Sequence, residues 1–146
     1  MSSAPHDHPV NPLPPVIVAL FLLIVGIEAM FLLGTRGILG GPEAVGWRQA
    51  AIQDYGFNAE VFAWMRQQGL WPMEHLKRFG TYIFIHGSFT HALIGGVMLL
   101  ALGKFVAEVF AQWATLVLFV ASAVVGALVF GLVGPERPWP MGTFPG

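Results

Sequence analysis

Two histidines, His86 and His91, stand five residues apart at the mouth of a long apolar stretch. Histidines are costly to bury in a membrane segment, so the pair needs a physical reason. Their ring nitrogens could bind zinc, but a five-residue spacing on a helix separates two side chains by about 140°. No further cluster of Cys, His or acidic residues completes a ligand set, so we expect neither a metal nor another cofactor. A structural role is the simpler interpretation, in which His86, Ser88 and Arg78 satisfy backbone groups at the entrance of a helix.

A further ionisable residue lies inside an apolar run. Glu28 is the only charged residue between Val16 and Leu33. An acid inside a membrane helix is a candidate functional residue by default. It lies five residues before the end of the run, and Arg36 follows two helical turns later. We therefore expect a carboxylate that reaches the membrane boundary or pairs with a cation.

Three apolar segments could position these residues by crossing a membrane. Residues 16–33, 82–102 and 113–133 contain 18, 21 and 21 residues, and the last two segments carry no Lys, Arg, Asp or Glu. About 20 apolar residues are needed to cross a bilayer. The chain is 55% hydrophobic and only 10% charged, whereas soluble domains are roughly 25% charged. Since no period-two alternation is present, the pattern predicts an all-α membrane protein with three transmembrane helices.

The connection between the first two predicted helices is long. Residues 34–81 hold five of the seven basic residues and three of the five Trp. Within this connection Asn58 can cap a short helix that ends at Gly69. Tryptophan rings favour the membrane–water boundary, so we expect an interfacial loop that lies in or against the bilayer surface. Proline-rich segments at residues 1–15 and 134–146 are expected to be tails.

Composition argues against several other classes of protein. The net charge is −1 and the basic residues form no run, so we expect no nucleic-acid binding. The absence of Cys removes disulfides, thiolate metal sites and a Cys nucleophile. The first 15 residues contain no Lys or Arg, which a cleavable signal peptide needs, so the first apolar segment is expected to be retained as a helix.

The octet Phe84-Ile85-His86-Gly87-Ser88-Phe89-Thr90-His91 resembles the start of the second transmembrane helix in rhomboid intramembrane serine proteases. Three further features occur in the family's order: Lys77-Arg78, Leu102-Gly103 followed by Glu108, and Pro138-Trp139-Pro140-Met141-Gly142. The resemblance covers about Leu76 to the end of the sequence. It implies that residues 16–133 form a rhomboid-like transmembrane region that corresponds to the first half of a six-helix domain.

Rhomboid chemistry, as the resemblance implies it, uses a Gly-x-Ser-Gly serine on the fourth helix and a His on the sixth. An oxyanion site is formed partly by the second-helix His and an Asn one turn later. His91 matches that histidine as an oxyanion-like remnant, but Gly95 stands one turn on and has no side-chain donor. At the nucleophile motif, Phe144 takes the position of the serine and Pro145 that of the following glycine. No Ser occurs after Ser122 and the sixth-helix His is absent, so we expect no catalytic residue and no peptide cleavage from this chain as written.

We therefore expect a catalytically inactive rhomboid-like integral membrane protein that binds other membrane proteins, in the inner membrane of a bacterial cell. One alternative is the N-terminal half of an active rhomboid protease, which a Gly-x-Ser-Gly beyond Gly146 would support. Another is an accessory subunit of a larger membrane complex. Small-residue pairs such as Ala92…Gly96 and Ala127…Gly131 let helices approach closely, either within the chain or with a partner.

The expected partners are membrane lipid and other transmembrane proteins, and nucleic acid is not among them. Two signals favour opposite orientations in the membrane. The Lys/Arg bias favours a cytoplasmic location for residues 34–81, whereas the resemblance implies that this loop lies outside.

Overall fold

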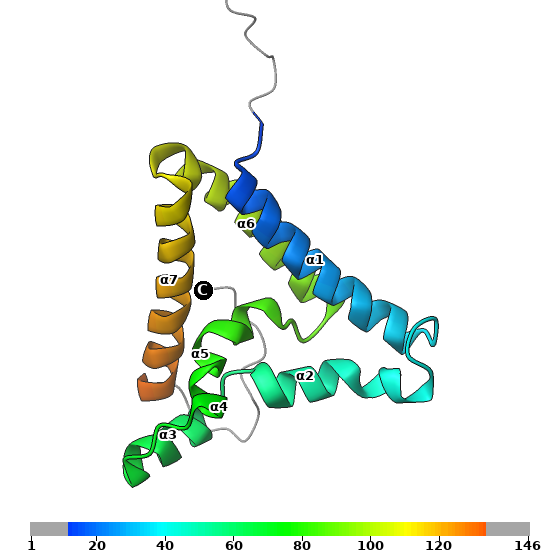
Figure 1. The fold of residues 1–146 in the computed structure, drawn as a ribbon, viewed down its shortest axis with the longest axis vertical. Helices are drawn as coiled ribbons and strands as arrows, with labels where there is room; N and C mark the ends of the chain where they lie inside the picture. Colours follow the sequence, from blue (N-terminus) through cyan, green and yellow to red (C-terminus); the bar gives the residue numbers. More distant parts are fainter. Residues whose placement is uncertain (1–11, 134–146) are drawn as a thin grey trace, which may run out of the picture.

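The computed structural model describes residues 12–133, and this part of the chain is built from helices without strands (Figure 1). Three helices are long and apolar enough to cross a membrane: α1 (Pro15–Thr35), α6 (Phe89–Val109) and α7 (Gln112–Val133). The prediction of an all-α membrane protein with three spanning helices is therefore confirmed. Residues 1–11 of the first expected tail and the whole of the second, residues 134–146, lie outside the described residues.

The helix α1 has clear start and stop signals. Pro15 occupies its first turn, where proline is tolerated because that backbone N–H has no partner within the helix. At the other end the Thr35 hydroxyl donates to the Phe31 carbonyl oxygen at 2.8 Å, and Gly37 turns the chain with a φ of +69°. Both ends of α1 lie within two residues of the predicted segment 16–33.

The second spanning helix differs from the prediction, because α6 begins at Phe89 rather than at residue 82. The short 3-10 turn η2 (Tyr82–Phe84) comes first, and the backbone is extended at Ile85 and again at Ser88, which has φ −153° and ψ 161°. The Ser88 side chain caps α6 by accepting a hydrogen bond from the His91 backbone N–H at 3.2 Å. Apolar composition alone did not reveal this cap, and it placed the helix seven residues too early.

The end of α6 also lies beyond the predicted segment 82–102. The helix continues to Val109 and so includes two charged residues, Lys104 and Glu108. Their side chains form an ion pair one helical turn apart, with 3.7 Å between Nζ and Oε1. Such a pair at the end of a spanning helix can remain near the membrane–water boundary, so the two charges do not stop the helix.

The long connection consists of short helices and is called the connecting segment below (residues 36–88). These helices are η1 (Pro42–Gly46), α2 (Trp47–Tyr55), α3 (Ala59–Gln68), α4 (Met73–Leu76), α5 (Arg78–Thr81) and then η2. The Asn58 side chain caps α3 by accepting from the backbone N–H of Glu60 at 2.8 Å and of Val61 at 3.1 Å. Gly69 ends α3 in the left-handed conformation with a φ of +67°. Both signals were visible in the sequence.

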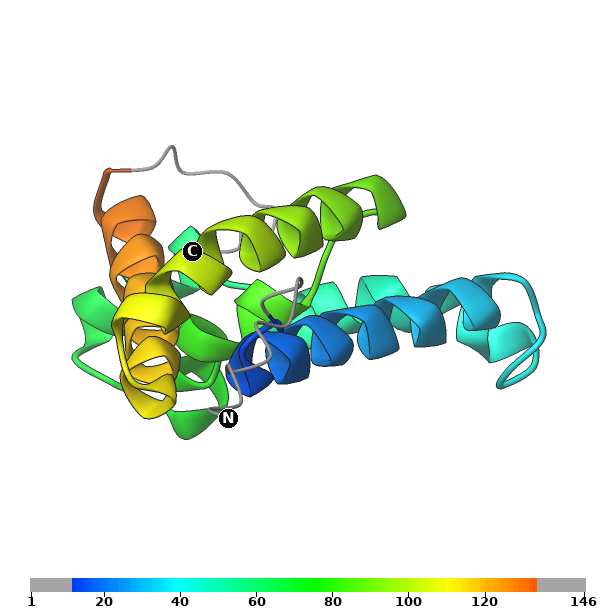
Figure 2. The same cartoon turned by 90° about the horizontal axis from the view of Figure 1, so that it is seen from above.

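The elements are arranged as the three sides of a triangle (Figure 1). The helices α1 and α6 run antiparallel, side by side, along one side (Figures 1 and 2). The helix α7 forms the second side and diverges from α6 after the turn at Phe110 and Ala111. The connecting segment forms the third side, between the far ends of α1 and α7.

Two kinds of packing hold these sides together. Glycines on α6 let α1 approach closely, since a Cβ on Gly96 would lie 3.0 Å from the Phe21 ring and one on Gly103 would lie 2.7 Å from Ile17. On α7 the small residues face the connecting segment instead of another spanning helix. Ala123 and Ala127 are fully buried there in one apolar cluster, whose other members are Phe57, Phe62, Met65, Phe79, Tyr82 and Ile83. The connecting segment is therefore part of the core.

Candidate functional site

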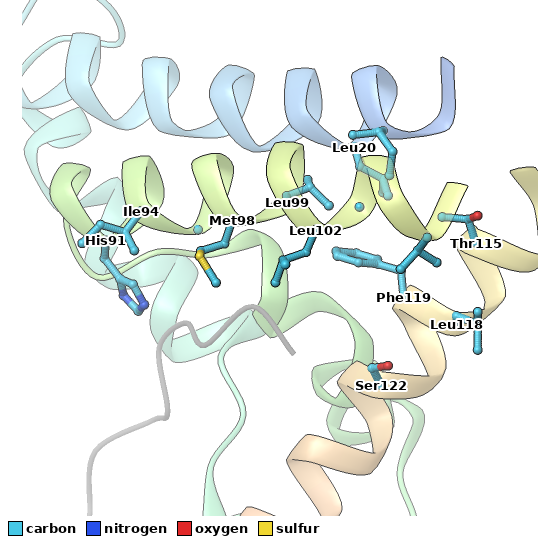
Figure 3. A pocket seen from close by; sticks show the side chains of 14 residues that line it. Leu20, His91, Ile94, Met98, Leu99, Leu102, Thr115, Leu118, Phe119 and Ser122 are labelled. Carbon is cyan, nitrogen blue, oxygen red and sulfur yellow. The ribbon is translucent and has the colours of Figure 1, made fainter. Parts of the chain in front are cut away.

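A cavity of about 550 Å³ lies where α6 and α7 diverge, and α1 contributes to one end (Figure 3). We call it the α6–α7 groove. Its lining is Ile17, Leu20, His91, Ile94, Gly95, Met98, Leu99, Leu102, Gly103, Val106, Thr115, Leu118, Phe119 and Ser122. The α6 part of the lining runs from His91 to Val106, which corresponds to about 22 Å of helix at 1.5 Å per residue. The groove is therefore long and mostly apolar, with three polar side chains.

The predicted oxyanion-like position lies on the α6 wall of this groove. His91 and Gly95 are one helical turn apart, and both residues line the cavity. Gly95 is buried and adds no side-chain donor beside the imidazole. Opposite, α7 presents Ser122 and Thr115, and the Thr115 hydroxyl donates to the Ala111 carbonyl oxygen at 3.3 Å. The α6 wall thus offers only the His91 imidazole at a position where the resemblance implies two hydrogen-bond donors, a His and an Asn.

The other histidine of the octet is buried behind His91. His86 is 1% exposed, and its ring meets the His91 ring edge-on, with 5.4 Å between centroids and 84° between planes. The Nε2 atom of His86 has no hydrogen-bond partner among residues 12–133. Burial lowers the pKa of His86, and the nearby His91 lowers it further, while the Phe84 backbone and Glu28 oppose the shift. His86 is accordingly a buried residue that packs against the ring of His91.

The intramembrane acid is paired, although not with the basic residue nearest in sequence. Arg48 at the start of α2 donates to both carboxylate oxygens of Glu28, at 2.5 and 3.0 Å. The same guanidinium donates to the His86 carbonyl oxygen at 2.6 Å and lies 5.1 Å from the centre of the Phe31 ring. Arg36, the cation that the sequence suggested, is exposed beyond the end of α1. A planar guanidinium suits this bidentate geometry.

Arg78 and Ser88 play different local roles. Ser88 caps α6, as an entrance residue should. Arg78 is directed away from that entrance and donates to the carbonyl oxygens of Gln53 at 2.6 Å and of Gly56 at 3.0 Å. It thereby satisfies backbone groups at the end of α2, where a cation also complements the helix dipole.

The remaining predicted site positions are those of the nucleophile motif. Phe144 and Pro145 belong to the part of the chain that the structure does not describe. Among residues 12–133, no three His, Asp or Glu side chains gather in an arrangement that could hold a metal ion. Sequence reasoning missed Arg48 as the partner of Glu28, because the two residues are 20 positions apart and belong to different elements.

Fold and site together describe an integral membrane protein with an apolar groove between two spanning helices. Comparison with protein families adds a more specific result, since residues 73–143 match the model of the Rhomboid domain. The match covers just under half of the chain, begins at the first residue of α4 and includes all of α6 and α7. The resemblance to rhomboids is confirmed for this region, so the chain is an integral membrane protein with a segment that matches the Rhomboid domain. Searches of curated proteins and of solved structures gave no match.

Proposed function

We propose that this rhomboid-like protein is catalytically inactive and binds the transmembrane helices of other membrane proteins in the α6–α7 groove. The observation that carries the proposal is the groove itself. It runs along α6 between two helices that can cross a membrane, so its occupant in a bilayer is a lipid chain or a helix. The small residues Gly95 and Ser122 on opposite walls favour a helix, because they allow its backbone to come close.

The lack of activity is inferred from three positions. Gly95 replaces the second donor of the oxyanion site, and losing one such donor typically lowers a rate by about 10²–10³. Phe144 has no nucleophilic atom, and Pro145 has no backbone N–H to donate. In this proposal His91 is an oxyanion-like remnant that now contributes a polar contact at the wall of a binding groove. We place the protein in a bacterial inner membrane, in keeping with its composition and resemblance.

The proposal is tested by site-specific photo-crosslinking in native membranes. Met98 and Leu118 line the groove and are 49% and 42% exposed. Val97 and Val117 each precede one of them, are 56% and 57% exposed, and lie about 100° away on their helices, so they are matched controls. A photoreactive residue at Met98 or Leu118 should capture one and the same transmembrane segment of another protein, identified by peptide mass spectrometry.

The controls at Val97 and Val117 should give lipid adducts only. Lipid adducts at all four positions would contradict helix binding. Inactivity has a separate readout, in which the full chain in lipid nanodiscs is treated with a serine-directed fluorophosphonate and with a transmembrane substrate. Labelling of the chain together with cleavage of the substrate would overturn the inactive assignment.

A second candidate function is the N-terminal half of an active rhomboid protease. The observation in its favour is that His91 lines a cavity open to a further helix, as an oxyanion residue would. A longer transcript that encodes Gly-x-Ser-Gly after residue 146 and a later helical His would support this candidate.

A further inference from the structure

The groove has no continuous contact between its two walls. The helix α6 lies against α1, and α7 diverges from both after Phe110 (Figure 1). Something other than direct packing between α6 and α7 must therefore fix the distance between them at the open end. The connecting segment lies across that end (Figure 1).

The attachment of the connecting segment to α7 is apolar and tight. Phe62 is 3% exposed, and a Cβ on Gly131 would lie only 2.5 Å from its ring. The Tyr82 hydroxyl donates to the Ala123 carbonyl oxygen at 2.9 Å within the same buried cluster. A tyrosine hydroxyl that reaches a helical carbonyl fixes the position of that helix as well as its contact area.

The attachment to α1 includes the buried ion pair. Arg48 holds the Glu28 carboxylate through two hydrogen bonds, and the Glu28 side chain is only 7% exposed. Arg48 also holds the His86 carbonyl oxygen, so one guanidinium joins α1, α2 and the backbone that leads into α6. Beside it, a Cβ on Gly34 would lie 3.0 Å from the Ala44 carbonyl oxygen, which shows that η1 packs directly on α1.

Between these attachments the segment is braced internally. Arg78 binds the last carbonyl groups of α2, and the Thr81 hydroxyl donates to the Tyr55 carbonyl oxygen at 2.9 Å. The helix α2 is therefore fastened to α5, and α5 lies next to the cluster on α7. A displacement at one attachment is transmitted to the other, because the elements between them are joined by hydrogen bonds.

We propose that the connecting segment is a brace that sets the width of the α6–α7 groove, with Arg48 as its fastening on α1. The brace concerns the empty protein and does not depend on what occupies the groove. Because the Glu28 side chain is buried within the apolar helix α1, a carboxylate without its cation is disfavoured there, which favours the fastened state of the brace.

The test measures the distance between α6 and α7 by double electron–electron resonance on the full chain in nanodiscs. The sequence has no Cys, so cysteines introduced at Val97 and Val129, which are 56% and 55% exposed, carry the only spin labels. A second pair at Phe105 and Leu116 reports on the closed end of the groove, where α6 and α7 meet. With the brace intact, we expect a single narrow distance for both pairs. A broad distribution for the 97/129 pair would already overturn the proposal.

Three variants test the brace, two of them at its fastening on α1 and the third as a control. The double variant Glu28→Gln/Arg48→Gln removes both charges at once, so it leaves no buried charge unpaired. We expect it to shift or broaden the 97/129 distance while the 105/116 distance stays the same. Arg48→Lys keeps a cation that can donate to the Glu28 carboxylate and to the His86 carbonyl oxygen, so its 97/129 distance should stay closer to that of the parent than the distance in the double variant does. Arg36→Gln, which removes an exposed cation near the same end of α1, should change neither distance.

Tyr82→Phe loosens the other attachment of the brace and is expected to broaden the same 97/129 distance to a smaller extent. A 97/129 distance that is unchanged in the double variant and in Tyr82→Phe would overturn the brace. Equal changes in both label pairs would also overturn it, because they would indicate general loosening of the protein.

Discussion

The two walls of the groove are supported in different ways. The α6 wall is backed along its length by α1, with Gly96 and Gly103 in close contact with that helix and with the Glu28–Arg48 pair at one end. The α7 wall has no spanning helix behind it, and only 11% of its most apolar window is buried within the described residues. It is held at one end by its short connection to α6 and at the other by the aromatic cluster. One wall is a fixed surface, and the position of the other depends on the connecting segment.

Because of this difference, mutations can test separately the contacts that stabilise the α6 wall and those that stabilise the α7 wall. On the α6 side the decisive contacts are glycines and one polar network, whereas on the α7 side they are buried rings and one hydroxyl. Variants of each kind should therefore affect different parts of the molecule. The following changes are ordered from the largest expected effect to the smallest.

Removing one partner of the ion pair should have the largest effect. Arg48→Gln leaves the Glu28 carboxylate buried without its cation, which costs about 3–5 kcal/mol of unfolding free energy. The measurement is reversible unfolding in bicelles by steric trapping. The neutral double variant Glu28→Gln/Arg48→Gln is the control and should recover most of the loss. Equal destabilisation by the single and double variants would contradict the importance of the unpaired charge.

Truncating the aromatic cluster should have the next largest effect, on the α7 side. Phe62→Ala removes a ring that packs against Gly131, Phe57 and Phe79, and is expected to cost about 3 kcal/mol. Trp64→Ala removes a larger ring from the same helix, but Trp64 is 42% exposed, so its loss should be much smaller. Similar losses for the two variants would show that the cluster is not a core.

Deleting a single hydroxyl should have an intermediate effect. Tyr82→Phe keeps the ring and removes only the donor to the Ala123 carbonyl oxygen, at an expected cost of about 1 kcal/mol. The control is Tyr55→Phe, because Tyr55 is 42% exposed and its ring lies under the Lys77 ammonium group instead. A Tyr82→Phe variant as stable as the parent would show that this hydrogen bond does not stabilise the fold.

The smallest effect is expected from pH. The pKa of His86 is lowered in the folded protein, so the unfolded chain binds a proton more readily, and stability should fall as the pH drops below about 6.5. His91, Glu28 and Arg48 all act on this group, and Glu28 and the Phe84 backbone limit the shift. His86→Gln should weaken this dependence. An identical pH dependence in the parent and in His86→Gln would exclude His86 as the source.

Much of the fold follows from local physics that the sequence displays. Long apolar runs predicted the three spanning helices, and the Asn58 cap and Gly69 stop followed from residue types alone. The start of α6 did not, because residues 82–88 carry no Lys, Arg, Asp or Glu and continue the uncharged run, while the Ser88 cap marks the true beginning. Hydropathy measures transfer to lipid and does not identify which apolar residues pack against protein.

The site was predictable only in part. His91 and Gly95 were identified from spacing and resemblance, and the structure places both on one groove wall. The pairing of Glu28 with Arg48 depends on how the connecting segment folds back on α1, which no local pattern encodes. The pair Ala127…Gly131 suggested close contact with another helix, and it lies against the aromatic rings of the connecting segment, an arrangement that spacing alone does not predict.

The most direct test of the account is binding of a transmembrane helix to the groove. A fluorescent apolar peptide with a small-residue pair is titrated into nanodiscs that contain the full chain labelled at Val97→Cys, and energy transfer is recorded. Gly95→Leu fills the groove wall, whereas Gly26→Leu adds the same side chain to α1 at a position with open space around it. We expect binding by the parent and by Gly26→Leu, and at least about tenfold weaker binding by Gly95→Leu, equivalent to about 1.4 kcal/mol. Equal binding by all three proteins, or binding by none, would contradict it.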